Sequence, residues 1–366
     1  MSLLPLEGFR VGVTADRRAA EQGELLVRRG AEVVHAPTIS TEYLGHDDAV
    51  RQATEAVISG RPHYLIATTG IGVRAWFDAA QAWGLGDDLQ ETLAAAQVVA
   101  RGPKAAAAVQ VAGLDPAMTV ESERLDDIVP LLAERGLAGR TVALQHYGRR
   151  DDKLMAALAA EGATVVEVPV YRYRLPADDG RVGGLIDGAC AGDVDAVTFT
   201  SAPAVAHLLD AADALGRSEA LLRAFNESGV VAACIGPVCA EAARASGIAG
   251  PVAPERGRLG LLVRVLTDAL QARRREVRLG SALLVVQGRA AEVDGAVVRL
   301  TASEAGVLDH LVRRPGAVVS KQTMLRGGAT SERALEATVA RLRRRLGPAG
   351  GALRTVRARG YCLGLD

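Results

Sequence analysis

The sequence is poor in the residues that build metal centres and disulfide frameworks. Its 366 residues include four cysteines and six histidines. The cysteines, Cys190, Cys234, Cys239 and Cys362, form no C-x-x-C pair, and no two histidines have the spacing of metal ligands. These absences predict free, buried thiols in a reducing compartment and no metal site.

Long apolar segments are also lacking. No apolar run reaches the roughly 18 residues that a membrane-spanning helix needs, because Arg101 and Lys104 interrupt the longest candidate. The first residues show no signal-peptide pattern. We therefore expect a soluble, cytoplasmic protein with no membrane partner.

The sequence does contain an uneven distribution of charge, which the net charge does not reveal. The formal net charge is zero. Residues 273–366 nevertheless hold 18 Lys and Arg against 8 Asp and Glu, whereas residues 1–272 hold 25 against 35. A small basic segment on a larger acidic body is typical of a nucleic-acid-binding module joined to another function.

The basic segment has a regular order of predicted elements. Asp294-Gly295, between two alternating apolar stretches of residues 283–300, predicts a β-hairpin. Thr301 and Glu304 form a capping-box pattern ahead of an apolar helical stretch. Ser320 predicts the start of a short second helix, a third helix is expected over about residues 331–346, and the stretch after Gly347-Pro348 alternates like a second hairpin.

The third helix is expected to have an apolar face and a basic face. Leu335, Val339, Leu342 and Leu346 form the apolar stripe. On the other face, arginines suit guanine in the major groove and small apolar side chains suit the thymine methyl, while hairpin arginines suit phosphate or the minor groove. A charged helix face can also be merely solvated, but the order of elements favours binding to double-stranded DNA. The predicted contacts are Arg333, Ala337, Arg341, Arg344, Arg357 and Arg359, with Ala340 on the same face.

These motifs resemble the OmpR/PhoB-type winged-helix domain of bacterial response regulators over about residues 278–366. The landmarks are LTASEAGVLDHLVRRPGAVVSKQTML, ALEATVARLRRRLG and LRTVRARGYCL. The loop RGGATSER is shorter than is usual in that family, where the loop contacts RNA polymerase or the DNA backbone. The resemblance therefore implies DNA as a partner, with RNA polymerase or other regulators as further partners. The phosphoacceptor pattern that response regulators carry in front is absent from this sequence.

The acidic body repeats itself at an offset of about 132 residues. LEGFRVGVT is echoed by LAGRTVALQ, YLIATTGIGVRAWFDAA by AVTFTSAPAVAHLLDAA, and RGPKAAAAVQVAGL by IGPVCAEAARASGI. Each echo is a β-branched run, a turn and an Ala- and Leu-rich helical stretch. The pattern predicts parallel sheets covered by helices in two domains.

Residues 6–268 resemble uroporphyrinogen-III synthase, on the landmarks LEGFRVGVTADR, YLIATTGIGV, VYRYRLP, AVTFTSAPAV and AACIGPVCAEAARASGI. The resemblance implies two doubly wound α/β domains, residues 1–38 with 174–270 and residues 42–170, joined by a two-stranded ladder of PTISTEYL beside VPVYRYRL. The winged helix-turn-helix domain, residues 278–366, follows them. The family rearranges linear hydroxymethylbilane in the cleft between its domains, without a cofactor.

The same resemblance implies a ligand site at turns that follow the strands. Backbone N–H groups there would hold carboxylates of a small anionic or tetrapyrrole-like ligand, although such turns can also simply cap helices. Cations that could pair with the carboxylates are Arg101, Lys104, Arg149, Arg150 and Arg172. GIGVRA also fits a dinucleotide-binding pattern, a weaker alternative because its repeat partner SAPAV has no glycine. The candidate ligand-binding residues are Thr69, Gly70, Gly72, Thr200, Ser201, Gly236 and Val238.

Tyr171 matches the family tyrosine proposed to help the leaving hydroxyl depart, a role that a general acid could fill. It could equally be an interface tyrosine with an ordinary hydrogen bond. Val238-Cys239 stands where active synthases commonly carry hydroxyl side chains, and Thr14-Ala15 where threonine-arginine is frequent. These departures predict weak or absent turnover.

Taken together, the synthase-like body and the winged-helix domain are interpreted as a bacterial one-component transcription regulator. We expect it to be a homodimer at least on DNA. Its synthase-like body would sense a ligand or form the dimer. Fusions of this kind resemble actinobacterial regulators of nitrate and nitrite assimilation. The alternatives are a synthase that also regulates transcription, and an inactive body that serves as a scaffold.

Overall fold

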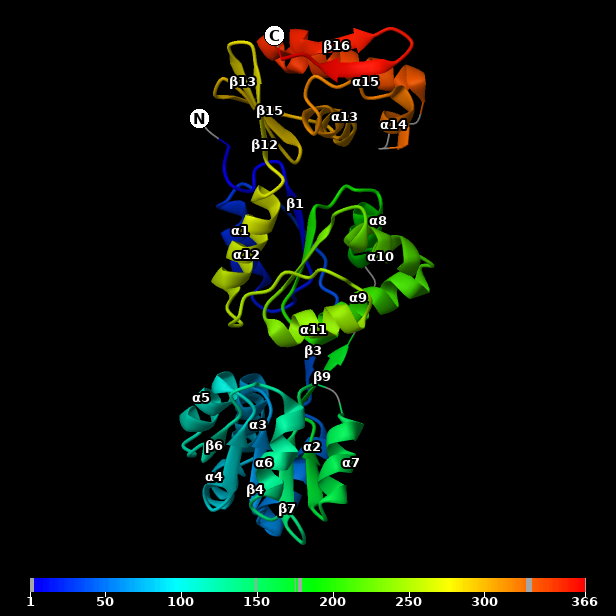
Figure 1. Cartoon of the computed structure of the whole chain (residues 1–366). Coiled ribbons are helices and arrows are strands. Elements are labelled where there is room, and N and C mark those ends of the chain that lie inside the picture. The colour runs from blue at the N-terminus through cyan, green and yellow to red at the C-terminus, as the bar shows by residue number, and fades with distance from the viewer. Residues whose placement is uncertain (1–2, 149, 175, 177–179, 327–330, 366) are drawn as a thin grey trace. The chain divides into compact units, whose positions relative to one another are not determined.

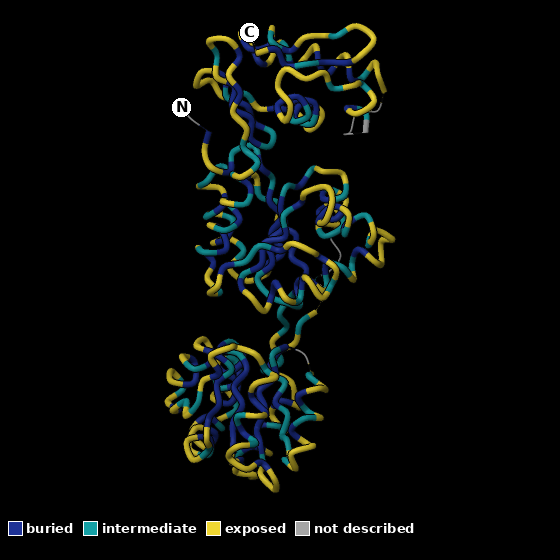
Figure 2. Tube along the Cα trace, in the orientation of Figure 1, coloured by how far each residue is buried: buried dark blue, intermediate teal, exposed yellow. Residues whose placement is uncertain are grey.

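The computed structural model describes residues 3–148, 150–174, 176, 180–326 and 331–365. The chain divides into two compact units, Ser40–Leu175 and Met1–Ile39 with Pro176–Asp366, and each is described by itself. The central strands of the parallel sheets are traced largely as buried residues, whereas the edge strands are less buried (Figure 2). Among the described residues, every helix is too short or too polar to cross a bilayer.

The unit of residues 40–175 is built on a five-stranded parallel sheet in the order β6-β5-β4-β7-β8 (Figure 1). Its strands are short apolar runs, and β4 is buried along its whole length. Leu65 and Ala67 pack into one apolar cluster, whereas Tyr64 and Ile66 pack into another. Since side chains alternate along a strand, helices cover both faces. The strands are β4 (Tyr64–Ala67), β5 (Gln97–Ala100), β6 (Met118–Thr119), β7 (Thr141–Gln145) and β8 (Thr164–Val168).

Three helices of this unit begin at a side chain that caps them. Asp47, Thr69 and Asp151 each accept a hydrogen bond from a backbone N–H of the helix that they precede. The helices are α2 (Asp48–Gly60), α3 (Gly70–Ala82), α4 (Gly86–Ala94), α5 (Pro103–Val111), α6 (Ile128–Ala133) and α7 (Asp152–Ala160), with a 3-10 turn at Leu125–Asp127.

A two-stranded antiparallel ladder belongs to the same unit. Strand β3 (Ser40–Tyr43) pairs with β9 (Tyr171–Arg174), so that Tyr43 lies opposite Tyr171. The predicted side-by-side course of PTISTEYL and VPVYRYRL is confirmed.

The second unit begins with a four-stranded parallel sheet in the order β11-β10-β1-β2. Its strands are β1 (Arg10–Val13), β2 (Glu32–His35), β10 (Ala196–Phe199) and β11 (Val231–Cys234). Leu262, Val263 and Leu266 of α12 pack with Val11 and Val13 of β1 in one buried cluster. Its helices are α1 (Ala19–Val27), α8 (Arg181–Cys190), α9 (Ala202–Ala214), α10 (Ser218–Asn226), α11 (Pro237–Ala245) and α12 (Leu259–Gln271).

The strand orders confirm the internal duplication. The sequence repeat equates β1, β2, β10 and β11 with β7, β8, β4 and β5. Written in these equivalents, the order β11-β10-β1-β2 becomes β5-β4-β7-β8, which is the order found in the other sheet. The two copies of the repeated β–α sequence pattern have therefore folded into sheets with the same strand order.

The basic segment forms a winged helix in the second unit. The hairpin predicted around Asp294-Gly295 is confirmed as two paired antiparallel strands. Two further strands that were not predicted precede it. The resulting antiparallel sheet is β12 (Arg275–Leu279), β13 (Ala282–Gln287), β14 (Ala290–Val293) and β15 (Ala296–Arg299). The predicted turn at Asp294-Gly295 is correct: both residues have positive φ, 48° and 84°.

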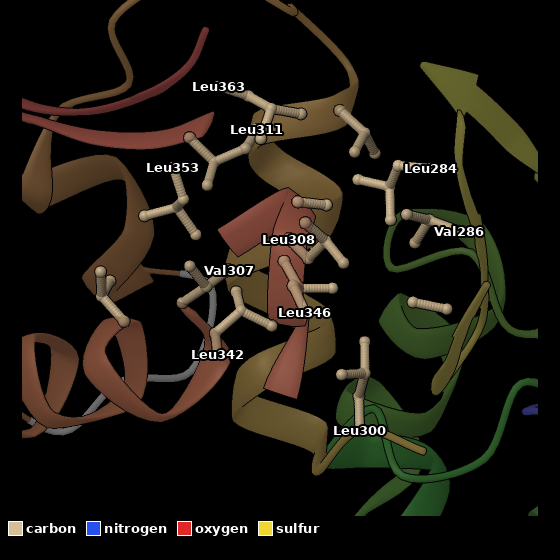
Figure 3. Close-up of a cluster of buried hydrophobic side chains, with 14 of the residues drawn as sticks. Leu284, Val286, Leu300, Val307, Leu308, Leu311, Leu342, Leu346, Leu353 and Leu363 are labelled. Atoms are coloured by element: carbon tan, nitrogen blue, oxygen red, sulfur yellow. The ribbon is translucent and has the colours of Figure 1, made fainter. Parts of the chain in front are cut away.

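Three helices and a second hairpin complete the module. Thr301 caps α13 in a full capping box with Glu304, as predicted. Leucines of α13 and α15 meet those of both sheets in one core (Figure 3). Residues 327–330 of the RGGATSER loop lie outside the described residues. The elements are α13 (Ala302–Val312), α14 (Lys321–Arg326), α15 (Glu332–Arg345), a 3-10 turn (Gly347–Ala352), β16 (Leu353–Val356) and β17 (Gly360–Leu363).

Candidate functional site

The turn after β4 is partly filled by the protein itself. Gln145, fully buried at the end of β7, accepts hydrogen bonds at Oε1 from the N–H groups of Thr68 and Thr69, both at 3.2 Å. Thr69 Oγ1 accepts from Gly72 N at 3.2 Å. In the first turn of α3 this leaves the N–H groups of Gly70 and Ile71 without a helical acceptor. A carboxylate at this turn would find two backbone donors.

The two glycines of this turn are accounted for by close packing. A Cβ at Gly70 would lie 2.3 Å from the carbonyl oxygen of Lys104, and one at Gly72 would lie 2.0 Å from Nε2 of Gln145. A side chain at either position would displace its neighbours. The pattern GIGVRA therefore has a structural explanation that involves no dinucleotide.

Tyr171 is buried beside this turn, 1% exposed. Its hydroxyl lies 3.1 Å from Thr69 Oγ1, and its ring meets Tyr173 edge-on with centroids 5.5 Å apart. Burial raises the pKa of the Tyr171 phenol well above its ordinary value. In this arrangement Tyr171 is a protonated, buried phenol, and either its hydroxyl or that of Thr69 can be the donor in their hydrogen bond.

Most of the predicted cations around Tyr171 already have partners inside the protein. Arg101 donates to the carbonyl of Glu123 at 3.0 Å and lies 5.7 Å from the ring centre of Tyr147. Arg172 pairs with Glu42. Lys104 is exposed and has no ion pair within the described part of the chain. Arg149 lies outside the described residues.

Arg150 belongs to a polar cluster that the sequence analysis missed. It pairs with Glu167 at 2.8 and 3.0 Å, and Glu167 also lies 2.8 Å from Nε2 of the buried His146. The Arg150 guanidinium holds the pKa of the Glu167 carboxyl below its ordinary value. The repeat could have drawn attention to Gln145 and His146, because they occupy the position of Thr14-Ala15 in the other copy.

The equivalent turns of the other unit have a different chemistry. Thr14 is too short to act as Gln145 does, and its hydroxyl donates to the Thr198 carbonyl at 2.7 Å. Gln22, a buried residue that sequence analysis also missed, donates to Thr198 Oγ1 at 2.7 Å. Ser201 precedes α9 after Thr200, and its buried hydroxyl has no partner within the described residues.

The turn after β11 presents an apolar side chain where hydroxyls are usual in synthases. Gly236 precedes α11 in extended backbone, and Val238 is 38% exposed. Cys239 is buried, with Sγ 3.7 Å from the carbonyl of Phe199. All four cysteines are free, as expected, but the expected burial is wrong for Cys190 and Cys362, which are partly exposed.

The basic face of α15 forms a candidate nucleic-acid interface. Ser331 caps the helix, and burial of Leu335, Val339 and Leu342 turns the opposite face outward. The residues Arg333, Ala337, Ala340, Arg341 and Arg344 are exposed on that face. Arg357 and Arg359 are exposed in the turn between β16 and β17, where Ala358 has φ 58°.

Two arginines of α15 contact a buried carboxylate. Glu304 is fully buried, and its Oε1 lies 3.7 Å from Nε of Arg341 and 3.5 Å from Nε of Arg345. Arg343 donates to the carbonyl of Leu353 and to Thr355, which ties α15 to the second hairpin. Arg341 thus contacts a buried carboxylate while it also lies on the exposed basic face of α15. Among the described residues, Arg333, Arg344, Arg357 and Arg359 form no ion pair.

Within the described residues no three His, Cys, Asp or Glu side chains are grouped as metal ligands would be. The features present are turns that follow parallel strands in a duplicated α/β body and an arginine-rich helix beside a hairpin turn. This combination defines a class: an α/β body fused to a winged-helix DNA-binding domain.

Comparison with known proteins agrees with this class. Residues 21–264 match the family of uroporphyrinogen-III synthase HemD. Residues 295–363 match the family of the C-terminal domain of transcriptional regulatory proteins. The chain belongs to the uroporphyrinogen-III synthase HemD family and carries a DNA-binding domain of the OmpR/PhoB type.

Relatives and solved structures cover the body of the chain. An uncharacterized protein of Bacillus subtilis, YjjA, is 30% identical over 258 residues, which is 70% of this chain and 94% of the relative. A putative uroporphyrinogen-III synthase of Methanothermobacter thermautotrophicus is 29% identical over 65% of this chain and 89% of its own length. A mutant uroporphyrinogen III synthase from Thermus thermophilus is similar in structure, with a TM-score of 0.60 and 32% identity over 72% of this chain and 99% of its own.

Proposed function

We propose that this protein is a DNA-binding transcription regulator whose synthase-like body senses a small anionic, tetrapyrrole-like ligand or forms the dimer. The observation that carries the proposal is the exposed face of α15, where Arg333, Ala337 and Arg344 follow one another at helical spacing. Arg357 and Arg359 lie in the neighbouring hairpin turn, a suitable place for phosphate or minor-groove contact. Resemblance to regulators of nitrate and nitrite assimilation makes such genes the proposed targets.

The test is capture of genomic DNA fragments by the full chain, followed by sequencing and affinity measurement. Arg333→Ala or Arg344→Ala should each cost about 1–3 kcal/mol and relax specificity at one base pair. Arg357→Ala or Arg359→Ala should weaken all sequences alike and flatten the salt dependence. Arg28→Ala is the control, because Arg28 is an exposed arginine at the end of α1. If no fragment is retained at low salt, the regulator proposal fails.

A ligand-sensing role for the body is supported by the donors left open at Gly70 and Ile71 and by the exposed Lys104. A ligand can change DNA affinity only if it binds the competent and incompetent forms unequally. Hydroxymethylbilane and uroporphyrinogen are the probes, added during the DNA titration. A change in DNA affinity that Lys104→Ala reduces supports sensing, whereas no change with either probe favours the scaffold alternative.

The second candidate is a synthase that also regulates transcription. The contact of Tyr171 with Thr69, together with the similarity to the Thermus thermophilus synthase, favours it. The burial of Tyr171 and the apolar Val238 favour weak turnover instead. The test supplies hydroxymethylbilane and measures the ratio of type III to type I product against a sample without protein. Type III product that Tyr171→Phe abolishes would place the bifunctional enzyme first.

A further inference from the structure

The N-terminal residues of the chain lie against the winged helix within the same unit. Gln287, the last residue of β13, is 1% exposed and donates from Nε2 to the carbonyls of Leu4 and Glu7, at 2.9 and 2.8 Å. Its Oε1 accepts from Gln271 of α12 at 2.7 Å. One buried amide therefore joins the N-terminal segment, the last helix of the α/β body and the DNA-binding module.

Two glycines allow the backbones to approach closely at this junction. A Cβ at Gly8 would lie 2.5 Å from the carbonyl oxygen of Gln287, and one at Gly288 would lie 2.6 Å from the carbonyl oxygen of Gly8. That Gly8 carbonyl accepts from Arg289 N at 2.7 Å. The main chains of residue 8 and of the β13–β14 turn are thus in direct contact, which a side chain at either glycine would prevent.

Apolar and charged contacts extend the junction. Leu3, Val285 and Ala290 form a buried cluster, and the N–H of Leu3 donates to Glu292 at 3.0 Å. Arg289 pairs with Asp193, which precedes β10, at 2.7 Å; the side chains are 20% and 43% exposed. Residues 272–274 alone connect α12 to β12, so the covalent link is short as well.

The surface used is the outer face and one turn of the β12–β15 sheet. None of the junction contacts named here involves α15 or the β16–β17 turn, where DNA contact is proposed. Docking therefore occupies one side of the winged helix and leaves its basic face uncovered.

We propose that residues 3–8 and the β13–β14 turn form a docking interface that holds the winged helix in one orientation on the first α/β domain while its DNA-binding face stays free. The winged helix is then held by packed contacts and not only by its covalent connection. A movement of the first α/β domain therefore changes the orientation of the DNA-binding face. The statement about the DNA-binding face rests on the proposed function; the docking itself does not.

The test without DNA uses trypsin, because Arg273, Arg274 and Arg275 occupy the connection between the body and the module. Gln287→Ala removes the buried amide and should increase cleavage there about tenfold, since cleavage of a transiently opened segment follows the open population. Gln52→Ala, at an exposed position of α2, is the matched control and should leave cleavage unchanged. Circular dichroism checks that the variants remain folded.

A charge swap distinguishes docking from a loss of folding. Arg289→Asp alone should increase cleavage, and adding Asp193→Arg should restore it toward the wild-type rate. Cleavage that none of these variants changes would overturn the proposal, and so would a double variant cleaved as fast as the single one.

A DNA-binding measurement tests the second part of the proposal. With a mixed-sequence duplex, Gln287→Ala should bind with an affinity within about twofold of wild type. A large gain in affinity would mean that the interface masks the DNA-binding face, which would overturn the second part.

Discussion

Single side chains distinguish the equivalent turns of the duplicated body. In one copy the Gln145 side chain occupies two backbone donors of the turn after β4, whereas in the other copy the Thr14 hydroxyl donates to a carbonyl of the neighbouring strand. Gly72 is the partner that makes room for Gln145, because a Cβ there would overlap the amide. The repeat in sequence has thus diverged in chemistry at equivalent positions.

Gly72→Ala should destabilise the unit of residues 40–175 by about 1–3 kcal/mol, as overpacking of a filled core does. Both tryptophans, Trp76 and Trp83, lie in this unit, so tryptophan fluorescence during urea unfolding reports on it alone. Shortening the facing side chain in Gly72→Ala/Gln145→Ala should recover part of the loss. Gly23→Ala, where a Cβ meets nothing within 4 Å, should leave the fluorescence transition unchanged. An unchanged midpoint in Gly72→Ala would contradict the packing explanation.

The pair of Arg150 with Glu167 should give this unit a pH-dependent stability. The Glu167 carboxyl has a lowered pKa, chiefly through its hydrogen bonds with Arg150. Its stabilisation is therefore complete above the ordinary glutamate pKa of about 4.3 and is lost as the pH falls through the lower value of the folded state. Arg150→Ala should lower the urea midpoint at pH 7, and the difference from wild type should vanish toward acid pH. Arg140→Ala, at an exposed site before β7, is the control. A difference that does not shrink as the pH falls below the ordinary glutamate pKa would contradict this assignment.

At the scale of elements, the winged helix is specified largely by local signals. The capping box of Thr301 and Glu304 starts α13, Ser331 starts α15, and positive φ at Asp294 and Gly295 turns β14 into β15. The apolar stripe of α15 then selects which face is buried. The sequence analysis missed strand β12 and the turn between β13 and β14, although glycines, Gly280 and Gly288, stand at the turns after β12 and β13.

Thr301→Ala should cost about 1 kcal/mol of local stability, because it removes the acceptor for the N–H of Glu304. Hydrogen exchange of backbone amides in α13, followed by mass spectrometry, measures this cost as faster exchange. Thr301→Ser keeps the hydroxyl and should exchange nearly as wild type. Equal exchange in the two variants would show that the cap does not stabilise α13.

At the scale of the whole molecule, one DNA-binding module is attached to a duplicated α/β body. A single module of this kind buries only about 600–1,000 Å² on DNA. Useful affinity for an operator therefore calls for two copies of the chain.

We predict a homodimer on DNA, with two half-sites about one helical turn apart. Footprinting of captured genomic fragments should show both half-sites, and sedimentation should show two chains per duplex. A duplex with one half-site scrambled is the control and should bind much more weakly. One chain per duplex, with a footprint over one half-site, would refute the prediction.

The sequence by itself determined the charge split, the duplication, the parallel sheets, the three helices of the basic module and the exposed arginines of α15. These features depend on local periodicity, capping and turn residues, which act between near neighbours in the chain. Only the tertiary structure decided that Gln145 fills the turn at Thr69, that Arg341 lies near buried Glu304, and that Leu3 and Gln287 belong to one interface. Each of these contacts joins segments far apart in sequence, and side chains of many kinds satisfy the same local pattern. Their partners are set by the way the packed elements bring the backbones together.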